Sequence, residues 1–155
     1  MFSKLQFGLM TGVLALSVGA GVAFAAMSAD DAIKARKACM KPGHTGVMGV
    51  AVPMMKGEKP FDAAALKVAF DAEDAACKDY TSLWGADTQK GDKEVTHAKA
   101  EIWSDPKGFE AAGGDWYKAD QAVRAATDEA SFKAAFPVLG KSCQSCHEKF
   151  RAPLQ

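Results

Sequence analysis

Two cysteines and a histidine near the end of the chain, Cys143, Cys146 and His147, form the pattern Cys-x-x-Cys-His. On a helix, two thiols three residues apart share one face with a histidine four residues from the first thiol. Both thiols can then add to the two vinyl groups of one porphyrin while the imidazole reaches its iron. The pattern is the attachment signature of a c-type haem. We therefore expect one covalently bound haem c per chain.

Two other chemistries also use closely spaced cysteines. A thioredoxin-like redox pair would follow a strand at the beginning of a helix, and a structural zinc site would need two further ligands at similar spacing. The sequence around Cys143 provides neither context. Haem attachment is therefore the preferred interpretation.

The first 25 residues have the pattern of a secretory signal peptide. Lys4 precedes an apolar run from Phe7 to Val18, and the segment ends in Ala-Phe-Ala at residues 23–25. A basic start, a short apolar core and small residues at the end are typical of such peptides. The run is too short and too rich in glycine for a membrane span. We expect cleavage after Ala25, export to a bacterial periplasm without a membrane anchor, and one mature domain over residues 26–155.

The charge balance argues against two classes of partner. The chain has 19 Lys and Arg residues and 19 Asp and Glu residues, and loss of the signal peptide would remove only Lys4 from this count. A chain with almost no net charge gives no electrostatic reason to expect nucleic acid or an anionic membrane as a partner.

The apolar spacing predicts an all-α domain. Alanine is plentiful and β-branched residues are scarce, which favours helix over strand. We expect helices over about 28–55, 62–85, 105–123 and 129–150, with a polar connection over 86–101. An interior proline removes a backbone donor and clashes with the preceding turn, so Pro42-Gly43 should disturb the first helix and Pro137 should kink the last. Four helices with short connections predict an antiparallel four-helix bundle.

The haem cysteines lie in the apolar seam of the last predicted helix. This seam repeats at intervals of three and four residues, through Phe132, Phe136, Leu139, Cys143, Cys146 and Phe150. The covalently attached haem c should therefore form part of the hydrophobic core, between facing helices.

Several stretches together resemble the cytochrome c′ family, the class II cytochromes c. They are Ala-Ile-Lys-Ala-Arg at 32–36, Met-Lys-Gly-Glu-Lys-Pro-Phe-Asp at 55–62, Glu-Ile-Trp-Ser-Asp at 101–105, and the segment 138–151 that contains the haem motif. The resemblance extends over essentially the whole mature length. A haem motif close to the C-terminus is itself the class II arrangement, and cytochrome c′ is one of the proteins that define four-helix bundles.

The resemblance implies roles for individual residues. It implies an antiparallel bundle, often dimeric, with His147 as the proximal iron ligand and Arg151 beside it. Arg36 is expected near a haem propionate, and Lys37 stands where the family often has glutamine. Two features depart from the family: the first helix normally runs without a Pro-Gly pair, and the stretch from Arg36 to the Lys-Gly turn is about one residue longer.

Met40 decides which function the resemblance implies. It lies four residues after Arg36, where the family places the side chain that caps the distal side of the iron. Many members have leucine there, which leaves the iron five-coordinate and open to small gases. A methionine can instead supply a thioether, and His/Met ligation suits electron transfer. The simpler alternative is that Met40 only fills an apolar gap, and His44 is a rival ligand.

Four other residues keep alternative interpretations. Arg36 and Arg151 could be solvated helix charges, but two haem carboxylates near an apolar core need cationic partners, which favours the propionate role for Arg36. Cys39 and Cys77 are left over after haem attachment. In an oxidising compartment they could form a disulfide, and two buried free thiols or an intermolecular bridge are alternatives.

Two functional hypotheses follow. The preferred one is a periplasmic one-electron carrier of the methionine-ligated c-556 type, with periplasmic redox proteins as partners. The alternative is a five-coordinate cytochrome c′ that binds NO or CO, and either form could be a homodimer. Peroxidase-like catalysis would need a distal acid–base histidine, for which only His44 is available, so we expect no enzyme activity.

The haem assignment can be tested by mass. Acid-denatured protein should show one species, a chain that begins at Ala26 and carries one haem through Cys143 and Cys146. Thioether bonds survive acid, whereas a merely coordinated haem does not. Release of haem into acidified acetone would contradict the assignment.

Overall fold

The computed structural model describes residues 27–153 apart from the side chain of His44, so the expected signal peptide lies outside the described residues. The described chain is helical, which confirms the all-α prediction. Its α-helices are α1 (Ala29–Lys41), α2 (Met48–Met55), α3 (Ala63–Cys77), α4 (Glu101–Ser104), α5 (Pro106–Arg124) and α6 (Glu129–Phe150). None of the helices in residues 27–153 combines the length and the apolar character needed to cross a bilayer.

Side-chain caps determine where the long helices begin. Ser28, Asp62, Asp105 and Asp128 each accept a hydrogen bond from the backbone N–H three residues later, at the starts of α1, α3, α5 and α6. Pro106 occupies the first turn of α5, where its missing N–H costs no helical hydrogen bond. These caps confirm the predicted helix starts.

Pro42 does not end the first helix. The chain passes from α1 to α2 through a π-helical segment, Pro42–Val47. Pro42 cannot donate a backbone hydrogen bond, and a π turn is one residue wider than an α turn, so it can absorb an extra residue within a helix. The predicted disturbance is therefore real, but it widens the helix locally.

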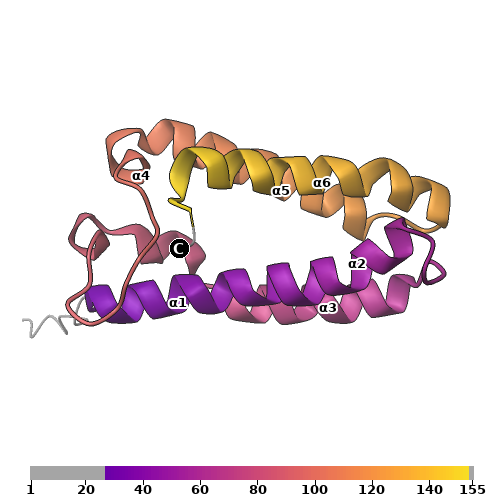
Figure 1. Cartoon of the computed structure of the whole chain (residues 1–155), viewed down its shortest axis with the longest axis horizontal. Coiled ribbons are helices and arrows are strands. Elements are labelled where there is room, and N and C mark those ends of the chain that lie inside the picture. Colours follow the sequence, from indigo (N-terminus) through magenta and orange to yellow (C-terminus); the bar gives the residue numbers. More distant parts are fainter. Residues whose placement is uncertain (1–26, 154–155) are drawn as a thin grey trace, which may run out of the picture.

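The helices form two antiparallel pairs. α1 and α2 pack along α3, and α5 packs along α6 (Figure 1). The pairs contact each other where α2 meets α6 and where α3 meets α5. The main core lies at this end of the bundle and consists of Val47, Ala51, Met54, Leu66, Ala69, Phe70, Ala119, Val123, Ala126, Phe132, Phe136 and Leu139. Each large apolar side chain buried here stabilises the fold by about 1.5–3 kcal/mol.

The second helix was expected over 62–85 but ends at Cys77, so the connection between α3 and α5 is longer than the predicted polar connection over 86–101. It contains two short 3-10 segments, Tyr80–Trp84 and Ala86–Thr88, and helix α4. Ala98 forms an antiparallel bridge with Arg151, and the Ala152 N–H donates to the His97 carbonyl over 2.7 Å. This backbone pairing attaches the connection to the end of α6.

Cys39 and Cys77 form a disulfide, with their Cα atoms 4.7 Å apart. Of the three alternatives that the sequence left open, the structure adopts the intramolecular bond. It joins α1, near its end, to the last residue of α3 and so crosslinks the first helix pair.

The disulfide should contribute measurably to stability. Replacing both Cys39 and Cys77 with alanine removes a crosslink that closes a separation of 38 residues, and we expect the free energy of unfolding to fall by about 3 kcal/mol. Denaturant titration of the haem-containing protein measures the change. Reductant should bring the wild type to the stability of the variant and leave the variant unchanged. Equal stability of both proteins without reductant would contradict this role.

Candidate functional site

One helical stripe of α1 and α2 is buried except at a single residue. The stripe follows helical spacing, with a step of seven residues from Met40 to Val47, the last residue of the π-helical segment. It comprises Ile33, Arg36, Met40, Val47, Ala51 and Met54. Five of these residues are at most 5% exposed, whereas Met40 is 43% exposed. Met40 therefore marks an interruption in the packing of this stripe.

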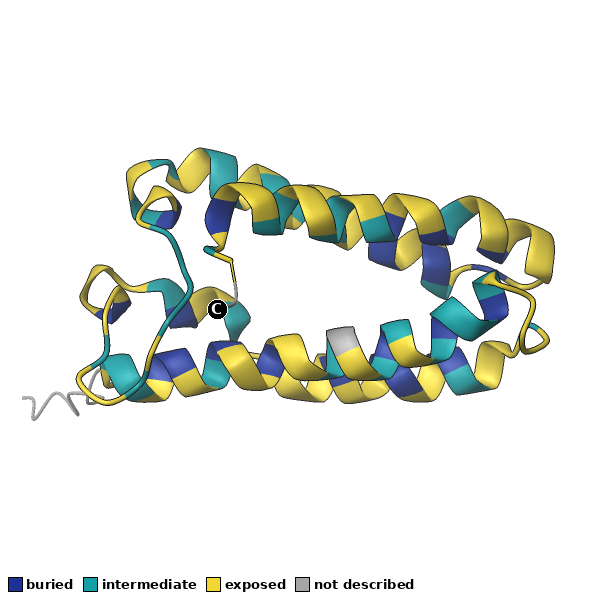
Figure 2. Ribbon diagram, viewed as in Figure 1, coloured by how far each residue is buried: buried dark blue, intermediate teal, exposed yellow. Residues whose placement is uncertain are grey.

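The apolar seam of α6 has a matching interruption. Phe132, Phe136 and Leu139 are buried near its start and Phe150 is buried at its end. Between them, Cys143 and Cys146 are only partly buried. Figure 2 shows the buried positions of α6 toward its two ends, with partly buried and exposed positions between them.

The two interruptions lie at the same level of the bundle. Met54 and Phe132 belong to the same core cluster, and α2 and α6 are in contact. Met40 precedes Met54 by fourteen residues in the sequence, and Cys146 follows Phe132 by fourteen residues. Because the two helices run antiparallel with about 1.5 Å rise per residue, these steps cover similar distances in the same direction. This counting puts Met40 at about the level of the last turns of α6 along the bundle.

The two thiols lack the properties of a redox pair. Burial raises the pKa of Cys143 and Cys146, and the charge of Glu73 raises that of Cys143 further. Thiols of thioredoxin-like sites have lowered pKa values and lie at helix N-termini, whereas these lie in the last turns of α6. Within residues 27–153, no group of three or more His, Cys, Asp or Glu side chains is arranged to hold a metal ion.

His147 and Arg151 lie together at the outer side of this region. Both line an open pocket of about 420 Å³, together with Lys99. His147 is partly buried in the last turn of α6, and Arg151 is exposed just after the helix ends. Arg151 and His147 thus line the same pocket, and the role of Arg151 beside a haem stays a prediction.

Arg36 is a buried cation in a polar and aromatic cradle. Its Nε donates to the Leu83 carbonyl over 3.0 Å, and one terminal nitrogen donates to the Thr88 carbonyl over 2.6 Å. The guanidinium lies 4.3 Å from the ring centre of Trp84. The other terminal nitrogen, Nη1, is buried without a hydrogen-bond partner, and no ion pair in the described part of the chain includes Arg36.

This unused donor fits a haem propionate. A buried guanidinium needs a negative partner, because burial disfavours its charged form and lowers its pKa. The donor set around it also fits haem c: two thiols at positions i and i+3, an imidazole directly after them, and a thioether across the bundle. These residues are the ones that would hold the cofactor.

For two of the predicted residues, the described contacts give no link to the residues that would hold the haem. Lys37 is exposed and pairs with Glu94, whose Oε2 lies 2.8 Å from the lysine Nζ. The side chain of His44, the rival ligand, lies outside what the structure describes. His44 itself belongs to the π-helical segment, four residues after Met40.

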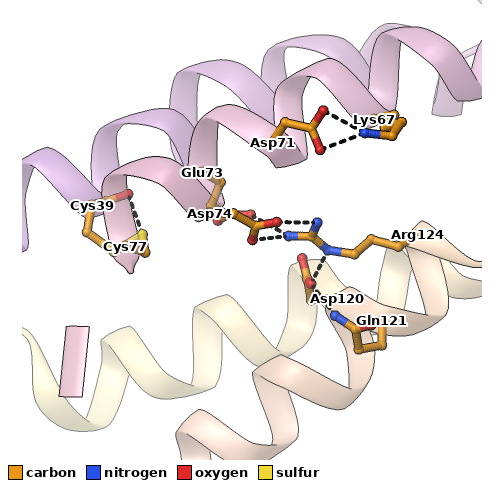
Figure 3. A network of polar contacts seen from close by, with 9 residues as sticks. All are labelled: Cys39, Lys67, Asp71, Glu73, Asp74, Cys77, Asp120, Gln121 and Arg124. Atoms are coloured by element: carbon orange, nitrogen blue, oxygen red, sulfur yellow. Dashed lines mark hydrogen bonds and ion pairs between the residues drawn. A yellow bond between two sulfur atoms is a disulfide. The ribbon is translucent and has the colours of Figure 1, made fainter. Parts of the chain in front are cut away.

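A charged cluster that the sequence did not predict lies between the helix pairs. Asp74 of α3 and Asp120 of α5 both point toward the Arg124 guanidinium (Figure 3). Glu73 lies beside them and is only 8% exposed. Its position was a signal that could have been used, because Glu73 falls in the same stripe as Leu66, Phe70 and Cys77, where an apolar residue is expected.

Comparisons with known proteins agree with this site. The family model described as Cytochrome C' matches residues 31–151. A cytochrome c′ from Cereibacter sphaeroides is 35% identical, over 92% of this chain and 98% of that protein. A cytochrome c-556 from Rhodopseudomonas palustris is 34% identical, over 83% of this chain and 88% of that protein.

Solved structures show the same fold. Cytochrome c′ from Rubrivivax gelatinosus superimposes with a TM-score of 0.71 at 30% identity, over 81% of this chain and 98% of that one. A nitric oxide complex of a cytochrome c prime variant from Alcaligenes xylosoxidans gives a TM-score of 0.69 at 27% identity, over 81% and 98% of the two chains. The relatives thus include proteins named cytochrome c′ and proteins named cytochrome c-556.

Replacing His147 tests its position in this site. His147→Ala should keep both thioethers but abolish the normal haem absorption spectrum. It should also lower the free energy of unfolding, because the bond that holds the cofactor within the core is lost. Absorption spectroscopy and denaturant titration measure the two effects. Gln144→Ala, an exposed position in the same part of α6, should change neither, and an unchanged spectrum in His147→Ala would show that another side chain provides the proximal bond.

Proposed function

This chain belongs to the cytochrome c′ family, whose members carry covalently bound haem c, and we propose that it is an exported one-electron carrier. In this proposal Cys143 and Cys146 hold the haem, His147 is the proximal iron ligand and Met40 is the distal ligand.

The exposure of Met40 is the observation that carries the proposal. A methionine that merely fills a core gap packs against other side chains and is buried, as Met54 is at 4% exposure. Met40 lies in the same stripe and is 43% exposed. Its thioether is therefore available at the level where the cofactor would be attached.

The remaining residues of the site have supporting roles. When bound, haem c supplies the iron that accepts and donates one electron. His147 and Met40 would both bind the iron, so that no ligand need leave on electron transfer. Arg36 would neutralise a propionate through its unused Nη1, and the disulfide at Cys39 fixes the residue next to Met40 to α3.

Two features support export. The sequence of residues 1–25 has the pattern of a signal peptide, and an intramolecular disulfide persists in oxidising compartments such as the bacterial periplasm. Electron exchange with periplasmic redox proteins follows from the proposed location and chemistry.

The second candidate function is binding of a small gas at an open iron. Relatives named cytochrome c′ support it, and one solved relative is a nitric oxide complex. In that case Met40 would lie above the cofactor without binding it, and NO or CO would take the distal position. The state of Met40 distinguishes the two functions.

Met40→Leu tests the proposed distal ligand. The wild-type protein should be six-coordinate and low-spin and should bind carbon monoxide slowly. The variant should become high-spin, bind carbon monoxide faster and have a lower reduction potential, because the lost thioether favours ferrous iron and blocks access. Absorption spectra, flow kinetics and redox titration measure these changes.

Met54→Leu is the matched control, since it makes the same substitution at a buried position of the same stripe. It should leave the spectrum and the potential unchanged. A wild-type protein that is already high-spin, and that Met40→Leu barely alters, would reject the electron-carrier proposal in favour of gas binding.

A further inference from the structure

Glu73 is a carboxyl group buried between the two helix pairs without a full ionic partner. Its Oε2 is buried without any hydrogen bond, and the nearest cation, Nη2 of Arg124, is 3.8 Å away. Its Oε1 lies 2.6 Å from the position that a Cβ on Gly43 would take, so the carboxyl group is close to the π-helical segment. A larger residue at position 43 would displace it.

The surrounding charges do not balance. One guanidinium, that of Arg124, faces three carboxyl groups (Figure 3). Asp74 binds it through two hydrogen bonds of 2.8 and 3.0 Å, and Asp120 binds its Nε over 2.5 Å. Glu73 receives no hydrogen bond from Arg124, so a proton is the remaining way to neutralise it.

The environment places this protonation near neutral pH. Burial is the main cause that raises the pKa of Glu73, from its ordinary value of 4.5 to about 7, and the charge of Asp120 acts in the same direction. Arg124 opposes this rise without cancelling it. Both forms of the carboxyl group are therefore populated around pH 7.

Glu73 is also close to the place where the cofactor would be attached. Its negative charge raises the pKa of Cys143, so its field reaches that sulfur. Two charges that interact in a poorly solvated region influence each other, and a change at either one shifts the equilibrium at the other.

We propose that Glu73 is a proton-binding site coupled to electron transfer, an inference that rests on the proposed haem attachment at Cys143. When the protein accepts one electron from a redox partner, one proton moves from solvent to a carboxylate oxygen of Glu73. When the electron leaves, the O–H bond breaks and the proton returns to solvent. The net charge of the buried region then stays constant through the cycle.

Several other groups face Glu73 and could titrate with it. α5 contributes Asp120 and Arg124, α3 contributes Asp74, and α6 contributes Cys143, which no longer titrates once it is a thioether. The π-helical segment contributes the backbone at Gly43, and His44 follows it in the sequence. His44 needs its own control, because histidine titrates in the same pH range.

Redox titration of the haem-containing protein at a series of pH values centred on 7 tests the proposal. The wild-type potential should fall as the pH rises, by at most about 59 mV per pH unit for one proton per electron. Glu73→Gln, which keeps the shape but cannot ionise, should make the potential independent of pH in this range. Glu58→Gln, in the exposed turn before α3, should behave as the wild type.

Two further variants assign the effect. His44→Gln should retain the wild-type pH dependence. Asp120→Asn should shift that dependence to lower pH, because it removes a charge that raises the pKa of Glu73 and leaves Arg124 free to pair with it. A wild-type potential that does not vary with pH would overturn the proposal. So would a dependence that survives in Glu73→Gln or disappears in His44→Gln.

Protein stability gives a readout that needs no electron transfer. Glu73 binds its proton more tightly in the folded than in the unfolded chain, so folding loses stability as the pH rises from about 4.5 through about 7. Unfolding titrations should show this loss in the wild type, relative to Glu73→Gln at each pH. If the two proteins respond to pH in parallel over that range, Glu73 has no raised pKa and the proposal fails.

The outcomes separate this inference from the proposed function. In one outcome the wild type is high-spin and its potential varies with pH, whereas the potential of Glu73→Gln does not. This outcome would contradict Met40 ligation and support the proton site. A low-spin wild type with a potential independent of pH would support Met40 ligation and overturn the proton site.

Discussion

Apolar contact between the two helix pairs is confined largely to one end of the bundle, and the rest of the fold depends on this division. Val47, Phe70 and Phe132 belong to a continuous core there, whereas Met40 and the cysteines of α6 remain partly or substantially exposed further along the same stripes. A helix stripe that is apolar needs something apolar against it. In this family a porphyrin fulfils that need, so the cofactor completes the core as well as performing the chemistry.

The other end of the bundle is held by an aromatic cluster, in which Phe109 contacts both Trp84 and Phe150, and by bonds of other kinds. The disulfide joins α1 to α3, the Arg36 guanidinium binds carbonyls of the connection, and the end of the chain pairs with residues 97–99. These bonds keep the walls of the site in place, while Nη1 of Arg36 has no hydrogen-bond partner.

The sequence predicted those parts of the fold that depend on local patterns. Helix starts followed from Asp105 with Pro106, and the haem motif followed from its spacing. The disulfide was undecided because it depends on the register between α1 and α3, which the π-helical segment alters. The pairing of Ala98 with Arg151 leaves no side-chain signature. Glu73 was not predicted because the stripe was identified from apolar residues at helical spacing, and a carboxylate does not fit that pattern.

The four cysteines impose opposite requirements on the maturation of the protein. Cys39 and Cys77 must be oxidised to each other across 38 residues, whereas Cys143 and Cys146, three residues apart, must remain thiols until they react with haem. Four cysteines allow three sets of two disulfides, and each of them consumes the haem thiols. Oxidation in the periplasm would favour the short-range bond, since a shorter loop closes more readily. An exported chain of this design therefore needs selective reduction of its CxxC pair. Its yield should depend on keeping Cys143 and Cys146 reduced as well as on the supply of haem.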